Sequence, residues 1–435
     1  MQKIHSQFDD KLQKLKKDAK IIGYILASNF SEDVSVGSTG TKLGGLLDPV
    51  AIRERFEGSL QVEFNDGTIS KSTIDYFWLV DFDTKIMSLK KNSIKDEESK
   101  NYLFYENLPN FTKQFSRKLY DNHYSQKTEL IGRVRKYKEW MNSLNEKKQS
   151  IQAGVYKSLD TITNSANLHL SEKQTLISAS AFLGEITGFS LAKRQLIDMQ
   201  VEDEYMDVTT KYYLAMKKGV KPKNLALPVI LDTDAFPSLL SRFILTNLSG
   251  VSIYSKRSAW TLLDFSKRRQ ILADSIDITV KPKLSMKEWS ENFSSIGYIY
   301  PESFDFVKNG QLVAPICNYR NSRLLNTKVS PPVSSTKALY FGKSEKQMNL
   351  NQKIASMDEA MVITTLLGVH TQDEASGNFT LVAPNTLYIN DGQIVGRCEV
   401  MIRGNFFDIM KNCQTIYRDG LTLKPYIVTK HIETV

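Results

Sequence analysis

Residues 366–412 constrain the fold of this chain more than any other stretch. Apolar and polar residues alternate over residues 379–389 and again over 394–398, which predicts two strands that each bury one face. Asp391-Gly392 lies between them and suits a two-residue hairpin turn, because such a turn needs positive φ at both central positions. Asn405 then precedes a short apolar run and is the predicted N-cap of a helix. The stretch therefore predicts a strand hairpin followed by a helix.

The same stretch resembles the C-terminal signature of the TldD/PmbA family, which reads roughly HT…TGDFS…IENGEI…IAGNLLDML. Upstream, residues 307–312 and 330–337 fit the same order of segments. The resemblance extends over residues 225–412 and is only topological before them. Within it, six residues are expected to have structural roles: Gly377, Asn378, Phe379, Gly392, Gly404 and Asn405.

The resemblance implies an α+β chain of two domains. Residues 1–220 are expected to form an N-terminal α/β domain with helices packed on a sheet, and residues 221–435 a strand-rich, barrel-like domain. A polar segment with Gly and Pro at residues 218–223 suits a linker between them. The residue patterns predict helices at 5–27, 130–144, 203–218 and 236–248, strands at 60–64 and 76–80, and a long connection at 85–112.

The formal net charge is +9, from 57 lysines and arginines against 48 aspartates and glutamates. The basic residues are dispersed and no nucleic-acid-binding motif accompanies them, so we do not expect a nucleic-acid partner. No apolar run is long enough to span a membrane, and the lysine-rich start of the chain is unlike a secretory signal. The three cysteines are widely spaced, which is typical of reduced thiols. We therefore expect a soluble, cytoplasmic protein with no membrane partner.

Active members of the resembled family look like zinc peptidases. They carry His-Glu-x-x-x-His on a helix after the first strand of the C-terminal domain, and a Cys near the C-terminus. Ligands one helical turn apart share a face, and the Glu can activate the metal-bound water. The corresponding helix here, residues 236–248, contains no His, Glu or Cys. Cys413 lies too early to be the family's ligand and is predicted to be a packed thiol.

We therefore predict no catalytic residue, no metal ligand and no cofactor in this chain. Asp232 and Asp234 could together hold a divalent cation, but Asp234 is better explained as the N-cap of the next helix. A Ser–Lys nucleophile pair in the loop at residues 334–337 has no assured geometry. Four residues are instead candidates for a peptide-binding cavity: Ser334, Ser335, His370 and Thr371.

These features fit the metal-free TldE/PmbA type of family member. The resemblance implies a non-catalytic subunit of a cytosolic TldD/TldE-type zinc metallopeptidase that acts on unstructured peptides. Zinc would then be held by a TldD-type partner in a heterodimer, and peptides would add as a strand to a sheet edge. The alternative is a stand-alone homodimer that binds peptides or regulates a target, as the family's label of DNA gyrase modulator implies.

Overall fold

The computed structural model describes residues 2–18, 20–39, 47–96, 112–115, 127–146, 149–184, 187–222, 224–284 and 286–434. The chain divides into two compact units, and each is discontinuous in sequence. The N-terminal unit comprises Met1–Ala181, Ser190–Met199 and Lys283–Tyr300. The C-terminal unit comprises Phe182–Phe189, Gln200–Pro282 and Pro301–Val435. The predicted domains, 1–220 and 221–435, differ from this division at residues 182–189, 200–220 and 283–300.

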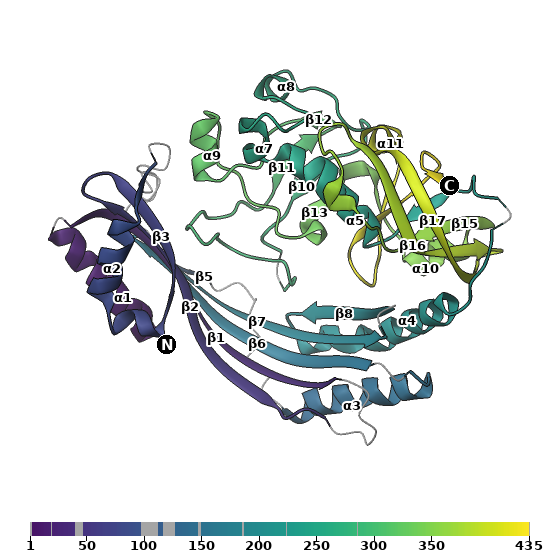
Figure 1. Cartoon of the computed structure of the whole chain (residues 1–435), viewed down its shortest axis with the longest axis horizontal. Helices are drawn as coiled ribbons and strands as arrows, with labels where there is room; N and C mark the ends of the chain where they lie inside the picture. Colours follow the sequence, from purple (N-terminus) through teal and green to yellow (C-terminus); the bar gives the residue numbers. More distant parts are fainter. Residues whose placement is uncertain are drawn as a thin grey trace. The chain divides into compact units, whose positions relative to one another are not determined.

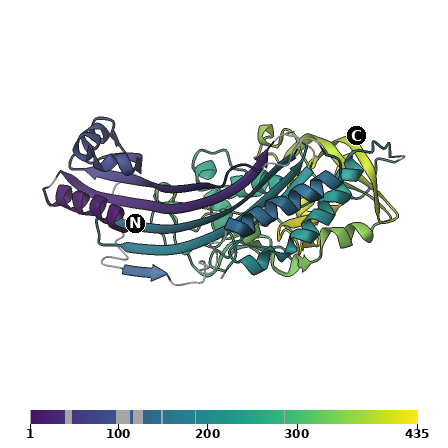
Figure 2. The same ribbon diagram turned by 90° about the horizontal axis from the view of Figure 1, so that it is seen from below.

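The first sheet is built mainly from long antiparallel strands that run side by side, and β5 pairs with β7 in parallel (Figure 1, Figure 2). The strand order is β4-β3-β2-β1-β6-β7-β5, and β8 pairs with β7. β1 pairs with β2 on one side and with β6 on the other along most of its length. The strands are β1 (Ile21–Thr39), β2 (Ala51–Phe64), β3 (Thr68–Asp75), β4 (Ile94–Lys95), β5 (Thr112–Phe115), β6 (Gln149–Asn164), β7 (His169–Leu183) and β8 (Thr187–Lys193).

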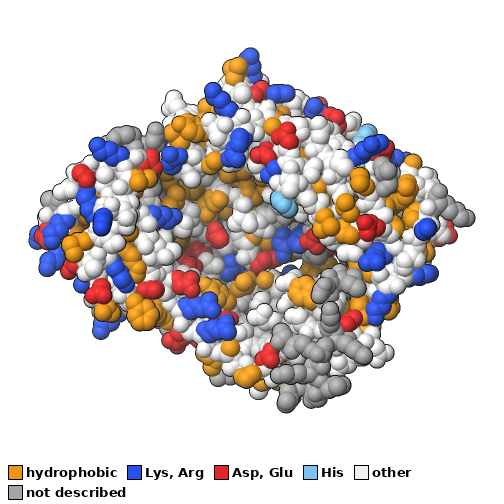
Figure 3. Space-filling view, viewed as in Figure 1, with side chains coloured by type: hydrophobic (Ala, Val, Ile, Leu, Met, Phe, Trp, Pro, Cys, Tyr) orange, Lys and Arg blue, Asp and Glu red, His pale blue; other side chains and the backbone are white. Residues whose placement is uncertain are grey.

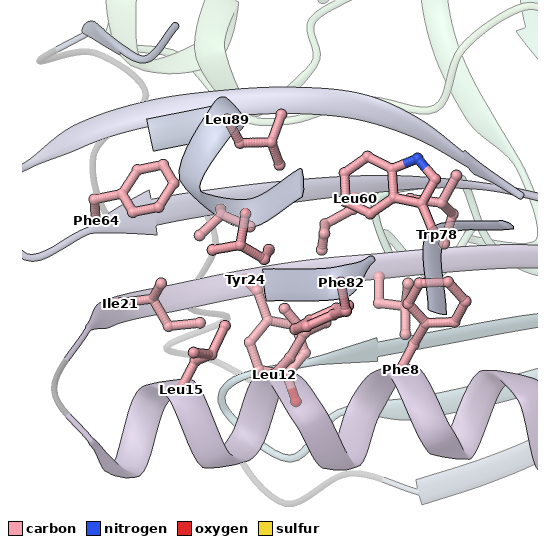
Figure 4. Packing of buried hydrophobic residues seen from close by; sticks show 14 of the residues in the cluster. Phe8, Leu12, Leu15, Ile21, Tyr24, Leu60, Phe64, Trp78, Phe82 and Leu89 are labelled. Atoms are coloured by element: carbon pink, nitrogen blue, oxygen red, sulfur yellow. The ribbon is translucent and has the colours of Figure 1, made fainter. Parts of the chain in front are cut away.

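Helices cover one end of this sheet and enclose an apolar core (Figure 4). Phe8, Leu12 and Leu15 follow each other at helical spacing on α1 (Gln2–Lys17), and all three face the strands. A fully buried side chain of this size stabilises the fold by about 1.5–3 kcal/mol relative to an exposed one. The other helices near this end are η1 (Tyr76–Leu79) and α2 (Phe82–Lys91), and α3 (Lys127–Ser143) packs on β1 and β6.

Three local predictions for this region were wrong. The helix predicted over residues 5–27 ends at Lys17, and its second half belongs to β1. The strand predicted at residues 76–80 is the 3₁₀ helix η1, because the Asp75 carboxylate accepts the Phe77 N–H at 3.0 Å and caps a helical turn. The connection predicted at residues 85–112 contains most of α2. Residues 97–111 of that segment lie outside the described residues.

The C-terminal unit contains a mixed sheet with the order β14-β18-β19-β9-β15-β16-β17-β20. The unit is strand-rich, as predicted. Its described strands form an open sheet and not the barrel-like one expected, because hairpin patterns identify neighbouring strands and do not determine whether a sheet closes. The strands are β9 (Val229–Leu231), β14 (Glu345–Gln347), β15 (Glu359–Ile363), β16 (Asn378–Asn390), β17 (Gln393–Asn405), β18 (Ile416–Arg418), β19 (Pro425–Thr429) and β20 (Glu433–Thr434).

A second, smaller sheet of this unit has the order β12-β11-β10-β13. Its strands are β10 (Ile278–Val280), β11 (Phe304–Lys308), β12 (Gln311–Leu312) and β13 (Leu339–Tyr340). The remaining helices are η2 (Leu196–Val201), α4 (Glu202–Met216), α5 (Ala235–Leu239), η3 (Leu240–Leu245), α6 (Thr246–Leu248), α7 (Gly250–Tyr254), α8 (Leu262–Ser266), α9 (Tyr319–Leu324), η4 (Thr336–Ala338), η5 (Gly342–Ser344), α10 (Leu350–Ala355), η6 (Val369–Thr371) and α11 (Phe406–Asn412).

The fold is therefore α+β, as predicted. Among the described residues, no helix combines the length and the apolar character needed to cross a membrane. Basic and acidic side chains are interspersed over the face seen in Figure 3. That distribution agrees with the dispersed charge of the sequence.

Candidate functional site

The first element of the candidate site is the continuous helical segment α5–η3–α6, which follows β9. The Asp232 carboxylate accepts the backbone N–H groups of Asp234 and Ala235, both at 2.9 Å, and so caps the segment. Asp234 occupies the N-cap position as predicted, but its side chain makes no capping hydrogen bond. The Asp234 carboxylate pairs instead with Lys424, with 2.5 Å between Oδ1 and Nζ.

Asp232 is buried, and burial raises the pKa of its carboxyl to about 7, with the nearby charge of Asp234 acting in the same direction. Its two backbone hydrogen bonds favour the ionised form and limit that rise. Asp232 is therefore a structural cap with a raised pKa.

One face of α5–η3–α6 is entirely in the core. Leu240, Phe243 and Ile244 are fully buried. The Phe243 ring stacks on that of Phe406 with 5.6 Å between centroids, and it lies 6.2 Å from that of Phe379. These side chains hold the helix against the signature hairpin.

The opposite face of the segment is polar and is tied to the loop after η6. Ser238 and Ser241 are exposed. Arg242 Nε donates to the carbonyl of Gln372 at 3.0 Å, and Arg242 Nη2 lies 2.6 Å from Glu374 Oε2. Because the pair is mostly shielded from water, it fixes the loop against the helix.

Asn247 adds a second tie at the end of the segment. Its Nδ2 donates to the carbonyl of Glu374 at 2.7 Å and to that of Phe243 at 2.8 Å. The middle of the segment, Leu240–Leu245, is a π-helical turn, a feature often found at functional sites. Sequence periodicity did not reveal this turn, because the spacing of apolar residues in a π-helical turn differs from that in an α-helix by no more than one residue.

The residues of this segment do not fit a zinc ion. The face directed to the loop offers serine hydroxyls, which are poor zinc ligands, and the Arg242 guanidinium, whose charge opposes a cation. Among the described residues, no group of three or more His, Cys, Asp or Glu could hold a metal. Cys413 is buried, as predicted for a packed thiol, and burial raises its pKa to about 11.

The four predicted peptide-binding residues lie in two separate loops. Ser335 Oγ accepts the Lys337 N–H at 3.2 Å and caps η4, and Thr371 Oγ1 donates to the carbonyl of Gly368 at 2.8 Å. Ser334 and His370 are exposed. Only the His370–Thr371 pair adjoins the loop that Arg242 binds. The role of these four residues in peptide binding stays a prediction.

Three of the six predicted structural residues meet at the open end of the signature hairpin, away from its turn. Asn405 caps α11 as predicted, since its Oδ1 accepts the N–H groups of Phe407 at 2.9 Å and Asp408 at 3.2 Å. Its Nδ2 donates to Asn378 Oδ1 at 2.9 Å. Gly377 has φ +74°, and its carbonyl accepts the Phe406 N–H at 2.8 Å. These contacts join both strand ends to the helix.

The other three predicted structural residues, Gly392, Gly404 and Phe379, lie where neighbouring atoms are closely packed. Gly392 has φ +70° in the hairpin turn, where a Cβ would lie 2.6 Å from the carbonyl oxygen of Ala355. Gly404 packs beside the Phe379 ring, which would lie 3.1 Å from an added Cβ. Phe379 itself is buried.

Sequence reasoning missed a groove of about 1000 Å³ at the end of this hairpin. It brings together four stretches of the chain that are separate in sequence, so no local pattern could have identified it. The lining consists of residues 224–228, 378–380, 403–404 and 430–434.

Comparison with known proteins identifies a family model and solved structures to which this chain is similar. Residues 225–433 match the family model described as the PmbA/TldA metallopeptidase C-terminal domain. No curated protein matches the chain in sequence. The match therefore assigns residues 225–433 to a domain family described as a metallopeptidase C-terminal domain. In the part of the chain that the structure describes, no group of three or more His, Cys, Asp or Glu could hold a metal. Through residues 225–433, the chain belongs to the TldD/PmbA family.

Three solved structures share the fold over nearly the whole chain. TldE from Thermococcus kodakarensis is 14% identical, with a TM-score of 0.70 over 98% of this chain and 99% of its own. A candidate modulator of DNA gyrase from Bacteroides thetaiotaomicron is 15% identical, with a TM-score of 0.76 over 98% and 97%. A similarly titled protein from Thermotoga maritima is 16% identical, with a TM-score of 0.73 over 99% and 100%.

Proposed function

We propose that this chain is a non-catalytic, TldE/PmbA-like subunit of a zinc metallopeptidase that acts on unstructured peptides in the cytoplasm. The observation that supports it most is the chemistry of α5–η3–α6. Where active members of the family are expected to present metal ligands, this chain presents Ser238, Ser241 and an arginine held by Glu374. Such a face cannot activate a zinc-bound water.

In this proposal the catalytic zinc belongs to a TldD-type partner chain, and the two chains form a heterodimer. This chain contributes a rigid surface, because Arg242 and Asn247 both bind Glu374 and so fix the loop after η6 to the helix. The likeness to a structure titled TldE supports a subunit role.

A second candidate function is a stand-alone homodimer with a regulatory, peptide-binding role. The titles of the Bacteroides and Thermotoga neighbours, which name a modulator of DNA gyrase, favour it. The two candidates differ in what accompanies the chain in the cell.

Affinity purification of the tagged chain from its own cells, followed by native mass spectrometry, tests the proposal. We expect an equimolar complex with a second family member that carries the His-Glu-x-x-x-His motif and bound zinc. A homodimer with no such companion, recovered at native expression levels, would contradict the heterodimer and support the second candidate.

A further inference from the structure

Residues 286–300 form a strap that belongs to the N-terminal unit but contains no helix and no strand of its sheet. Side chains attach it instead. An aromatic ring of the strap lies 5.5 Å from that of Phe115 on β5. Arg194 donates hydrogen bonds to three backbone carbonyls of the strap. The contact between Asn292 of the strap and Glu172 on β7 is a further attachment.

The contact between Glu172 and Asn292 leaves two buried oxygen atoms without a donor. Glu172 Oε2 accepts the Asn292 backbone N–H at 3.2 Å and its side-chain Nδ2 at 2.8 Å. The remaining oxygens, Glu172 Oε1 and Asn292 Oδ1, meet no donor among the residues that the structure describes. Glu172 is 2% exposed and Asn292 is 1% exposed. Because nearly all buried polar atoms are hydrogen-bonded, this pair of oxygens calls for one more donor.

The surroundings of Glu172 favour a proton as that donor. Burial raises the pKa of its carboxyl to about 7, and the charge of Asp160 acts in the same direction, against the Asn292 hydrogen bonds and the charge of Arg194. A bound metal ion would need further ligands, and the described residues include no group of three or more His, Cys, Asp or Glu that could hold one. The ionisable groups on the elements around Glu172 are Asp160 on β6, Arg194 after β8, Lys113 on β5, and Glu288, Glu291 and Tyr300 in the strap.

We propose that a proton on Glu172 Oε1 closes the strap onto the sheet, so that the strap acts as a pH-dependent latch. The protonated oxygen donates to Asn292 Oδ1, while Asn292 Nδ2 donates to Glu172 Oε2. The two side chains then form a carboxylic acid–amide pair with two hydrogen bonds, and both oxygens are satisfied. When solvent takes up the proton, a buried charge and two acceptors without a donor remain, which favours release of the strap. This inference goes beyond the proposed subunit role and does not depend on it.

The latch should loosen as the pH rises, within a definite window. The closed strap keeps the Glu172 proton up to about pH 7, whereas the ordinary pKa of a glutamate, expected once the strap is open, is 4.5. Opening therefore becomes about tenfold more favourable with each pH unit between these values and changes no further above them. From pH 5 to pH 8 the open population should increase roughly seventyfold.

Hydrogen–deuterium exchange of the purified full chain, read by mass spectrometry, tests the latch. The measured quantity is the protection factor of strap peptides, which compares each exchange rate with that of an unstructured chain at the same pH. The Asn292 and Tyr300 N–H groups are both hydrogen-bonded in the closed strap, so both should be protected. We expect the protection factor to fall roughly seventyfold from pH 5 to pH 8. A protection factor that does not change with pH would overturn the proposal.

Glu172→Gln is the most informative variant, because its amide imitates the protonated acid at every pH. Its Oε1 can accept from Asn292, and its Nε2 can donate to Asn292 Oδ1. We expect the strap of this variant at pH 8 to be as protected as that of the parent at pH 5. Substitutions that merely damage the fold lower protection, so a gain at pH 8 is specific to the latch.

Two further variants complete the test. Asn292→Leu removes the proposed acceptor and should lower the protection of the strap at pH 5 at least about tenfold. Glu57→Gln, an exposed substitution on β2 of the same unit, should keep the pH dependence of the parent. Circular dichroism establishes that each variant is folded. A folded Glu172→Gln chain whose strap still loosens as the pH rises would refute the assignment of the proton to Glu172.

Discussion

Arg242 distinguishes this chain at the scale of single residues. It lies on the outward face of α5–η3–α6, the helix expected to carry metal ligands in active family members. It binds the backbone of Gln372 and the side chain of Glu374, both in the loop after η6. Its side chain is 24% exposed and that of Glu374 is 16% exposed. An ion pair this sheltered leaves an unpaired charge behind when one partner is removed.

Arg242→Ala should therefore lower the free energy of unfolding by about 1–3 kcal/mol. Arg269→Ala is the control, since its partner is Asp264 at 3.3 Å in an exposed pair worth less than about 1 kcal/mol. Urea unfolding at pH 7 measures both. Equal, small losses in the two variants would show that the Arg242 pair does not fix the loop.

Glu172 is the residue whose protonation should couple most clearly to folding of the N-terminal unit. Its Oε2 accepts the Asn292 N–H at 3.2 Å and the Asn292 side-chain amide at 2.8 Å. Its Oε1 is buried and has no hydrogen-bond partner among the residues that the structure describes. Burial raises the pKa of Glu172 to about 7, against the effect of those hydrogen bonds. A proton on the carboxyl is thus favoured in the folded state.

Folding should consequently become less favourable as pH rises through this range. The folded carboxyl keeps its proton up to about pH 7, whereas its ordinary pKa is 4.5, so the contribution of Glu172 falls between these values and is constant above them. We expect a loss on the order of 2–3 kcal/mol. Glu172→Gln should abolish it, which urea midpoints at pH 5 and pH 8 will show.

The comparison with the parent chain isolates this effect. Asp232, whose pKa is also raised to about 7, titrates equally in the parent and in the variant, so it cancels. A Glu172→Gln variant with the same pH dependence as the parent would contradict the assignment.

At the scale of elements, the signature hairpin depends on glycines at positions that have positive φ or no room for a Cβ atom. Gly377 has φ +74°, and a Cβ there would lie 2.6 Å from Phe407 Cδ2. Gly377→Ala should cost about 1–3 kcal/mol, because it combines backbone strain with a clash against a ring.

Gly132→Ala is its matched control. Gly132 lies inside α3, and nothing is within 4 Å of a Cβ at that position. That substitution should stabilise the helix by about 0.5–1 kcal/mol. Thermal unfolding measures both variants, and a stabilised Gly377→Ala chain would show that the described turn is wrong.

The elements that sequence patterns predicted well are those determined locally. The hairpin pairs Asn390 with Gln393 around Asp391 at φ +50° and Gly392 at φ +70°, and Asn405 caps α11, all as expected. Helix α4, at Glu202–Met216, begins one residue before the predicted range 203–218 and ends two residues before its end. The η1 helix was missed because one carboxylate, that of Asp75, outweighs an apolar run with strand propensity.

The candidate site was only half predictable. The absence of metal ligands on residues 236–248 could be read from residue types alone. The contacts of Arg242 with the loop and the assembly of the groove join segments more than 100 residues apart, as in the case of Arg242 and Gln372, which are 130 apart. No local periodicity encodes such contacts.

At the scale of the whole molecule, the N-terminal unit includes a segment from late in the sequence. Residues 283–300 belong to it, and Arg194 binds them. Arg194 Nη2 donates to the carbonyls of Glu288 at 3.1 Å and Ser290 at 3.0 Å, and its Nε donates to that of Lys287 at 3.2 Å. The side chain is buried, so these bonds are protected from water.

Arg194→Ala should release residues 283–300 from the sheet. We expect trypsin to cleave after Lys287 about tenfold faster than in the parent, since a loss of about 1.4 kcal/mol raises the open population tenfold. Arg135→Ala, an exposed substitution in α3 of the same unit, should leave the rate unchanged. Equal cleavage in all three proteins would show that Arg194 does not hold the segment.

The central claim is that the α5–η3–α6 helix binds no metal ion. One of its faces packs in the apolar core, and the other presents Arg242, which pairs with Glu374. Zinc content measured by inductively coupled plasma mass spectrometry, on chain purified alone without chelators, tests it most directly. We expect zinc far below equimolar amounts, and no gain after incubation with zinc and desalting. Equimolar zinc that survives desalting, and that is lost in a chain substituted at Ser238 and Ser241, would contradict the claim.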